Sequence, residues 1–294
     1  MVSIGIIYAL IAMVSWSISD LTIKPLAKKF GTLNATIYKF LPHLVFLFIY
    51  FLIKGFFIPT DPLVWFLLLI FGIFGAIALL AFVKSIETGL ISINLAIAHA
   101  SVIVTAILSA IFFGEILNFY QYLIIILILF GITLLSFDQK SLLKFNFKKF
   151  NAGAKYAFIT VFGWGIIYAI IKPIALKIGP YASVFYPDLF VISIVFFIFL
   201  KKGLDRKEII TKVLTKKTLL LILLASITSF SAVIFTVKSI LVLKVALTFG
   251  IITAAPIVTT VLAMIFFKEK ITKLQGFAIL LVMVNIIILT IIGG

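Results

Sequence analysis

The chain has 294 residues, of which 64% are hydrophobic and only 12% are charged. Soluble domains carry about 25% charged residues, so this composition excludes an ordinary soluble domain. Long apolar runs instead predict a multi-pass integral membrane protein, because one crossing of a bilayer needs about 20 apolar residues. The net charge of +16 falls mostly in short gaps between these runs, as in cytoplasmic loops of membrane proteins, so we expect no nucleic-acid partner.

Ten apolar runs follow one another along the chain, and each predicts a transmembrane helix because backbone groups in lipid must be paired within the segment. We therefore predict an all-α membrane protein. In chain order the runs are Ile4–Ile23, Asn34–Ile53, Pro62–Val83, Leu90–Phe113, Ile116–Phe137, Ala154–Ile171, Tyr181–Leu200, Thr218–Val237, Val245–Phe267 and Leu274–Ile292.

The chain contains an internal repeat. The segment that begins Trp16-Ser17 and ends at Lys29 matches the segment from Trp164 to Lys177 without a gap, and Gly31 and Gly179 extend the match. Later segments match as well, among them Val-Lys-Ser-Ile at 83–86 and 237–240. We predict a first five-helix repeat at 1–137, a basic linker at 138–153 and a second five-helix repeat at 154–294. Because five is odd, the second repeat is inverted relative to the first, as in many transporters.

The basic residues predict the orientation. Most Lys and Arg residues follow the first, third, fifth, seventh and ninth runs. Since cytoplasmic loops are rich in these residues, this pattern predicts that both termini lie outside the cytoplasm.

Ionisable residues inside the predicted helices are candidates for function, because burying them in lipid is costly. Asp20 suits a proton, a cation or a substrate amine, and its alternative role is an ion pair with Lys24 one helical turn away. His99, at mid-depth, suits a titrating group or a neutral contact between helices. Lys39 and Asp188 each predict a partner on a neighbouring helix.

Aromatic and proline residues mark a cavity and its hinges. Trp16 and Trp164 occupy equivalent deep positions and either wall a central cavity or pack between helices. Proline stops or kinks a helix, so Pro25 and Pro173 are predicted hinges, and Pro256 is predicted to break the ninth helix.

Other chemistry is less well supported by the sequence. Five lysines suggest anion binding or anchoring at the membrane interface: Lys24, Lys84, Lys172, Lys238 and Lys244. Glu115 and Glu269 are predicted to cap the fifth and tenth helices. Cysteine is absent, no carboxylate pair has metal-binding spacing, and no acid lies near His43 or His99 in the sequence, so we expect no metal, no cofactor and no enzyme.

These motifs resemble the EamA-type members of the drug/metabolite transporter superfamily. The similarity rests on two five-helix halves with an early Trp, followed by Ser17 or Gly165, a Lys after the third helix, Glu115 after a small residue, and the Gln121 and Gln275 positions. The resemblance implies a central cavity between the halves and transport of amino acids or other small metabolites. It implies that the following residues face the cavity and bind substrate: Trp16, Asp20, Phe82, His99, Trp164, Tyr168, Phe235 and Thr253.

The chain departs from the family pattern at two informative points. Val102 stands where a proline equivalent to Pro256 is expected, so we predict no helix break in the fourth helix. The family usually has both termini in the cytoplasm, whereas the basic residues here predict the opposite.

The sequence as a whole predicts a secondary transporter or facilitator that moves a small polar metabolite, an amino acid or a related compound, by alternating access. Asp20 and His99 are the candidate coupling residues, with protons as the candidate coupling ion. The expected location is the inner membrane of a prokaryotic cell, in contact with lipid, as a monomer or a homodimer. The alternatives are a transporter of anionic or phosphorylated metabolites that uses the five lysines, and a membrane enzyme or lipid-handling scaffold.

Overall fold

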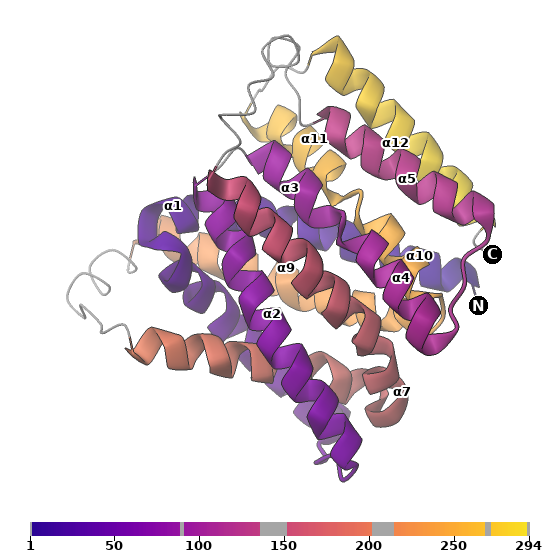
Figure 1. Cartoon of the computed structure of the whole chain (residues 1–294). Coiled ribbons are helices and arrows are strands. Elements are labelled where there is room, and N and C mark those ends of the chain that lie inside the picture. Colours follow the sequence, from indigo (N-terminus) through magenta and orange to yellow (C-terminus); the bar gives the residue numbers. More distant parts are fainter. Residues whose placement is uncertain (1, 89–90, 136–151, 202–214, 268–271, 293–294) are drawn as a thin grey trace.

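The computed structural model describes residues 2–88, 91–135, 152–201, 215–267 and 272–292. All regular secondary structure in these ranges is helical, as predicted (Figure 1). The predicted linker lies outside the described residues, apart from its last two positions. The first half forms α1 (Val2–Gly55), α2 (Pro62–Thr88), α3 (Ile91–His99), α4 (Ser101–Phe113) and α5 (Phe119–Leu135); the second forms α7 (Ala152–Lys201), α9 (Lys216–Ile240), α10 (Val245–Ile252), α11 (Ala255–Phe267) and α12 (Lys273–Ile292).

The two longest helices, α1 and α7, each contain a glycine corner. Gly31 has φ 76° and ψ 167°, and Gly179 has φ 75° and ψ 172°. Glycine adopts positive φ without the steric cost that a side chain would bring. Each corner divides its helix into a first limb, 2–30 or 152–178, and a second limb, 32–55 or 180–201. The two corners occupy equivalent positions in the sequence repeat.

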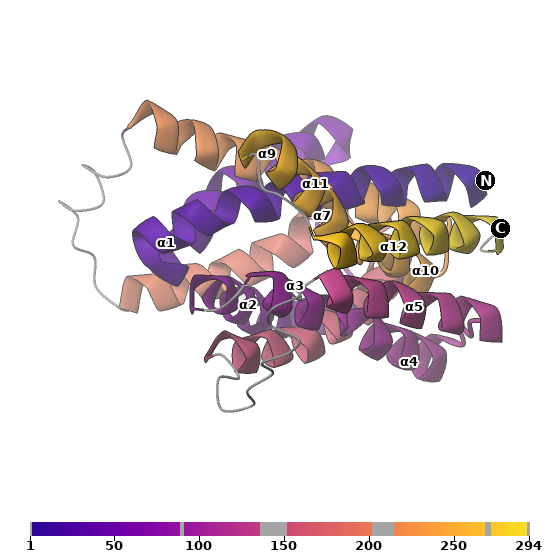
Figure 2. The ribbon, with the colours of Figure 1, turned by 90° about the horizontal axis from the view of Figure 1, so that it is seen from above.

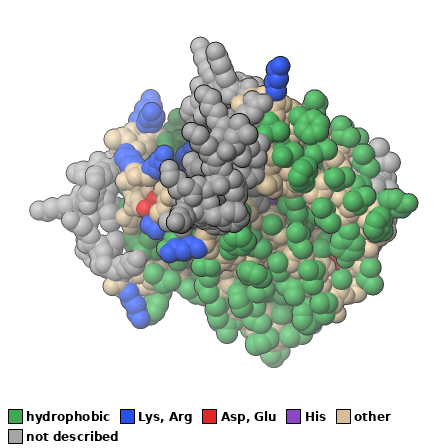
Figure 3. All heavy atoms as spheres, turned by 45° about the horizontal axis from the view of Figure 1, so that its top comes forward, with side chains coloured by type: hydrophobic (Ala, Val, Ile, Leu, Met, Phe, Trp, Pro, Cys, Tyr) green, Lys and Arg blue, Asp and Glu red, His purple; other side chains and the backbone are tan. Residues whose placement is uncertain are grey.

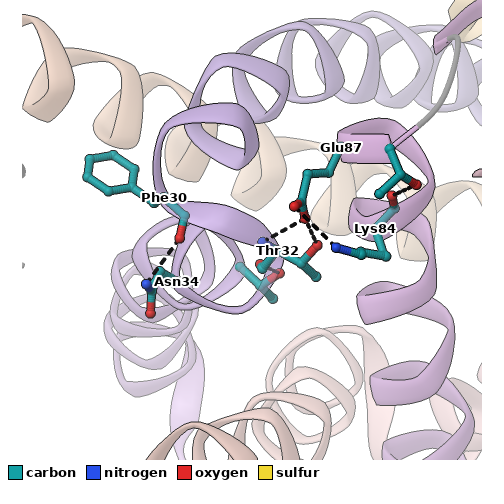
Figure 4. Close-up of polar contacts among 7 residues, drawn as sticks. Phe30, Thr32, Asn34, Lys84 and Glu87 are labelled. Atoms are coloured by element: carbon teal, nitrogen blue, oxygen red, sulfur yellow. Dashed lines mark hydrogen bonds and ion pairs between the residues drawn. The ribbon is translucent and has the colours of Figure 1, made fainter. Parts of the chain in front are cut away.

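The corner at Gly31 is fastened to the end of α2 by Glu87. The Glu87 carboxylate accepts hydrogen bonds from the Thr32 backbone N–H at 3.0 Å and from the Thr32 hydroxyl, and Lys84 Nζ donates to it at 3.2 Å (Figure 4). Glu87 therefore joins α1 to α2 at one end of the molecule.

Pro25 and Pro173 do not stop their helices, because α1 and α7 continue through both. The non-helical backbone of these elements lies instead at Gly31 and Gly179. A hinge at either proline stays a prediction.

Two helices, α3–α4 and α10–α11, are interrupted. The second interruption, at Thr253 and Ala254, comes just before Pro256, as predicted. The first, at Ala100, contradicts our expectation of a continuous fourth helix. No proline is needed there, because the Ala100 N–H turns back to Ile97 O at 3.0 Å.

The two halves pack reciprocally. Helix α2 of the first half packs along α7 of the second, α9 packs along α1, and α5 pairs with α12. Equivalent polar contacts also hold each interrupted helix to its neighbour. Asn94 Nδ2 donates to Ser85 O at 2.6 Å in the first half, and the hydroxyls of Thr248 and Ser239 share a hydrogen bond of 2.9 Å in the second.

The surface fits a protein surrounded by lipid. Helices α1, α2, α7 and α9 are each long and apolar enough to cross a membrane. Large apolar side chains cover much of the face in Figure 3, while lysines gather at one end of it. Both termini lie at the same end of the bundle (Figure 2).

Candidate functional site

A cavity of about 130 Å³ lies between the two halves. Both limbs of α1 and of α7 line it, and α2, α9 and the interrupted helices complete its wall. Its polar and aromatic lining residues are Trp16, Asp20, Lys39, Phe40, Phe71, Phe82, His99, Ser101, Trp164, Tyr168, Ser183, Asp188, Thr236, Phe249 and Thr253.

Seven of the eight residues that the resemblance placed at the cavity line it: Trp16, Asp20, Phe82, His99, Trp164, Tyr168 and Thr253. Phe235 does not belong to the lining that the structure describes. Its ring packs on Tyr8 at 5.7 Å between centroids and lies 5.4 Å from Lys238 Nζ. The face of α9 toward the cavity carries Val233 and Thr236, three residues apart, and Phe235 points away from that face.

An aromatic wall forms most of one side of the cavity. The Trp164 ring lies 4.6 Å from Phe82 and 5.9 Å from Tyr168, and Tyr168 stacks on Phe249 at 3.8 Å between centroids. Opposite this series, Trp16 Nε1 donates to Thr236 Oγ1 at 3.4 Å. Aromatic faces attract cations as well as apolar groups, so this wall suits a ligand that carries an ammonium group.

Equivalent hydrogen bonds hold the residues next to both tryptophans. Thr105 Oγ1 donates to Gly165 O, and Thr259 Oγ1 donates to Ser17 O, each at 3.4 Å. A Cβ on Gly165 would lie 2.4 Å from Val104, so only glycine allows this close approach. At the equivalent position, Ser17 Oγ donates to Ala255 O at 2.9 Å. The backbone beside each tryptophan is therefore fixed against the interrupted helix of the other half.

Four ionisable residues from three limbs gather at the cavity. The charge of Lys39 acts on both Asp20 and Asp188, and His43 Nε2 lies 2.7 Å from Asp188 Oδ2. Lys39 is thus a cation whose charge acts on Asp20. The expectation that no acid lies near His43 is wrong, because Asp188 comes from the other half of the chain.

His99 ends α3 beside the first interruption. Its side chain is buried, its ring lies 6.5 Å from that of Trp164, and Thr253 Oγ1 donates to its backbone oxygen at 3.5 Å. Nε2 of His99 has no hydrogen-bond partner among the described residues. This nitrogen is therefore available to a polar group of a ligand.

The five lysines of the anion hypothesis do not contribute to the described lining of the cavity. Lys172 pairs with Glu115, Lys84 with Glu87, and Lys244 donates to Ile116 O at 2.7 Å. Among the described lining residues the lysine is Lys39, on which the charges of Asp20 and Asp188 act.

Glu115 does not cap the helix that follows it. It accepts from Lys172 Nζ and from the Val245 N–H at 2.8 Å, so it caps α10 of the other half. Helix α5 begins instead with reciprocal bonds between Asn118 and Gln121. Glu269 lies outside the described residues.

The end of the molecule that carries the termini is held by further polar contacts. Lys172 Nζ also donates to Leu243 O at 3.0 Å, and Lys177 Nζ donates to Asp61 at 2.7 Å. The hydrogen bond from Lys177 lowers the pKa of the Asp61 carboxyl. The cavity is therefore covered by fastened segments on this side.

Metal binding receives no support from the geometry, since the described ranges contain no group of three residues of the types His, Cys, Asp and Glu that could hold an ion. The cavity can instead enclose a small solute among aromatic rings, hydroxyls and paired charges.

Comparisons with known proteins agree with this arrangement. The EamA-like transporter family matches the chain twice, at residues 3–137 and 151–291. A solved crystal structure, described only as a protein, is similar over 96% of this chain and 97% of that chain, with a TM-score of 0.69 and 14% sequence identity. That likeness shows the fold alone. No curated protein matches the sequence.

Proposed function

The chain belongs to the EamA-like transporter family of the drug/metabolite transporter superfamily, and we propose that it carries a small polar metabolite, an amino acid or a related compound, by alternating access. It is a multi-pass integral membrane protein of a family of transporters. The substrate class and the transport cycle are the parts that we propose.

The observation that carries this proposal is the cavity between the halves, which combines apolar walls with isolated polar groups. Ligand sites typically have mostly apolar linings with a few placed polar groups. Here Asp20 offers a negative charge to an amine, and Nε2 of His99, which has no partner in the described part of the chain, offers a hydrogen bond. Lys39 is available to a carboxylate only in competition with Asp20 and Asp188.

Ten crossings in two inverted repeats are part of the proposal. We count each limb of α1 and α7 as one crossing, and α3–α4 and α10–α11 as one interrupted crossing each. With α2, α5, α9 and α12, each half then crosses five times. The equivalent glycine corners and the reciprocal packing of α2 on α7 and α9 on α1 support this division.

Alternating access would rock the two halves about the cavity. The contacts of Glu115 with Lys172 and Val245 close the end that carries the termini, and those of Glu87 fasten the opposite corner. Pro25, Pro173 and Pro256 are the proposed hinges. Prokaryotic inner-membrane location and a monomeric or homodimeric state stay predictions.

An anionic substrate is the second candidate, because Lys39 lines the cavity. The negative charges of Asp20 and Asp188 already act on that lysine, so they disfavour binding of an anionic substrate beside it. An enzyme or a lipid-handling scaffold is less well supported, because the family consists of transporters.

Counterflow in proteoliposomes tests the proposal. Purified protein is reconstituted with a trapped excess of one unlabelled amino acid, sugar or phosphorylated metabolite, and entry of the labelled compound is followed. We expect transient accumulation of one or more amino acids above protein-free vesicles. Accumulation of phosphorylated compounds alone would contradict the proposed substrate class, and no accumulation of any compound would contradict transport of these solutes.

A further inference from the structure

The four ionisable residues at the cavity do not balance one another in charge. We name Asp20, Lys39, His43 and Asp188 the charge cluster. Two of its members are carboxylates and one is an ammonium, and His43 is fully buried behind Asp188. With a neutral imidazole the cluster carries one net negative charge.

A net charge in a buried site is costly unless a charge of opposite sign joins it. The cluster can reach neutrality in two ways. Either a carboxylate or the imidazole of the cluster takes up one proton, or a ligand brings one positive charge into the cavity. Protonation and cation binding each neutralise the same negative charge, so either one makes the other less favourable.

The geometry favours His43 as the imidazole that supports a bound proton. Its Nε2 lies 2.7 Å from Asp188 Oδ2, so a proton on this imidazole lies directly beside a carboxylate. A protonated imidazole is stabilised by a carboxylate at this distance. The other histidine, His99, has no described carboxylate within ion-pair distance, so a proton on it would gain less.

We propose that the His43–Asp188 pair, and not His99, holds the coupling proton, and that this proton exchanges for the positive charge of a cationic substrate. The inference rests on the proposed function, because it assigns the coupling site of the same cavity. It makes the protein an antiporter of one proton against one cation.

The proton balance of this exchange is simple. A proton from water on one side of the membrane enters at the Asp188 carboxylate, which lines the cavity, and passes to His43 Nε2, which forms an imidazolium paired with Asp188. When the substrate cation enters the cavity from the other side of the membrane, the pair releases the proton to the water on that other side. No covalent bond of the substrate changes.

The other titratable groups around the cluster fit this assignment. Among the described lining residues, Asp20 and Lys39 come from α1, Tyr168 from α7 and His99 from α3. Helix α9 faces the second limb of α1 with hydroxyls, since Ser226 Oγ donates to Lys39 O at 2.6 Å. Described charged residues of α2 lie near its last turn, at Lys84 and Glu87.

The test uses the full-length protein in proteoliposomes that contain a trapped pH-sensitive dye. Labelled lysine, leucine and glutamate, whose net charges are +1, 0 and −1, are supplied separately. For the wild type we expect lysine to enter in preference to the other two and to move protons in the opposite direction. His43→Gln, whose amide still donates to Asp188 but cannot hold a proton, should retain lysine–lysine counterflow. Its lysine-driven proton movement should fall at least about tenfold.

Two further variants make the result decisive. Tyr38→Phe is the matched control, because it removes a buried hydroxyl without a described partner one residue from Lys39, and it should behave as wild type. If His43→Gln loses lysine–lysine counterflow as well, the Asp188→Asn variant is measured next. Lysine-driven proton movement that continues in Asp188→Asn would overturn the inference.

The inference and the proposed function fail in different ways. Preference for leucine over lysine, or full proton movement by His43→Gln, would overturn the inference while amino acid transport stands. If the wild type exchanges none of the three compounds, both the inference and an amino acid substrate are contradicted.

Discussion

Asp20 and Tyr168 occupy equivalent positions in the two halves, yet only one of them is a carboxylate. His99 and Thr253 form a second pair of this kind. By contrast, Thr105 and Thr259 have kept the same hydroxyl and make the same bond to the opposite half. The two halves thus share the threonines that hold the backbone, while the ionisable side chains of Asp20 and His99 occur in the first half alone of each equivalent pair. Two halves with the same fold can in this way enclose a cavity whose net charge is negative.

The carboxylate of Asp20 is predicted to bind the amine of the substrate. Asp20→Asn keeps the size of the side chain but removes its charge, and hydrogen bonds to charged groups contribute about 1.5–3 kcal/mol. We expect the KM for the transported amino acid to rise at least about tenfold, because 1.4 kcal/mol corresponds to a factor of ten. Counterflow at varied substrate concentration measures this effect, with Tyr38→Phe as the control. An unchanged KM would exclude Asp20 as the amine contact.

Gly165 is predicted to be intolerant of a side chain. In Gly165→Ala the new Cβ would lie 2.4 Å from Val104, and overpacking of this kind costs about 1–3 kcal/mol. Ser17→Ala is the matched variant at the equivalent position. It removes the bond to Ala255 O, which contributes about 1 kcal/mol, without a clash. Thermal unfolding in lipid nanodiscs should show the larger loss for Gly165→Ala, and equal losses would show that the helices move apart freely.

At the scale of helices, apolar runs, the repeat and proline positions predicted the helical fold. The all-α fold followed from the apolar runs, the equivalence of Gly31 and Gly179 from the repeat, and the break before Pro256 from the proline itself. The break at Ala100 did not, because it depends on local backbone turning and lacks the proline that would have marked it. The role of Glu115 was also missed, since its partners Lys172 and Val245 come from the other half.

The sequence predicted part of the cavity lining but not the contacts between its two halves. The resemblance to EamA-type transporters placed eight residues at the cavity, and seven of them line it, while their roles in substrate binding stay predictions. Phe235, which the resemblance also placed there, packs on Tyr8 outside the described lining, because the family pattern does not specify which face of α9 turns to the cavity. The His43–Asp188 pair was not found because two residues 145 positions apart become neighbours only in the folded chain.

Glu115 is predicted to keep one end of the cavity closed. In Glu115→Gln the ion pair with Lys172 is lost, and this end should open more often. The wild-type chain lacks cysteine, so a single Ser101→Cys in the cavity lining reports access by a membrane-impermeant thiol reagent. We expect faster labelling from the side of the termini.

Glu87→Gln is the counterpart at the opposite end, where it weakens the contacts with Thr32 and Lys84. It should speed labelling of Ser101→Cys from the other side of the membrane. If both variants speed labelling from the same side, the two glutamates do not act on opposite ends of the cavity.

The molecule as a whole has chemically different ends, and this difference predicts its orientation. Helix α2 separates Thr60, on the side of the termini, from Thr88, on the side where the lysines of Figure 3 gather. The positive-inside rule therefore places Thr88 in the cytoplasm and both termini outside.

Both threonines are exposed, so Thr60→Cys and Thr88→Cys form a matched pair that leaves the charge unchanged. An impermeant maleimide added to intact cells should label Thr60→Cys, and should label Thr88→Cys only after permeabilisation. The reverse pattern would mean that contacts within the bundle, and not loop charge, set the topology of this chain, and that the end held by Glu115 faces the cytoplasm.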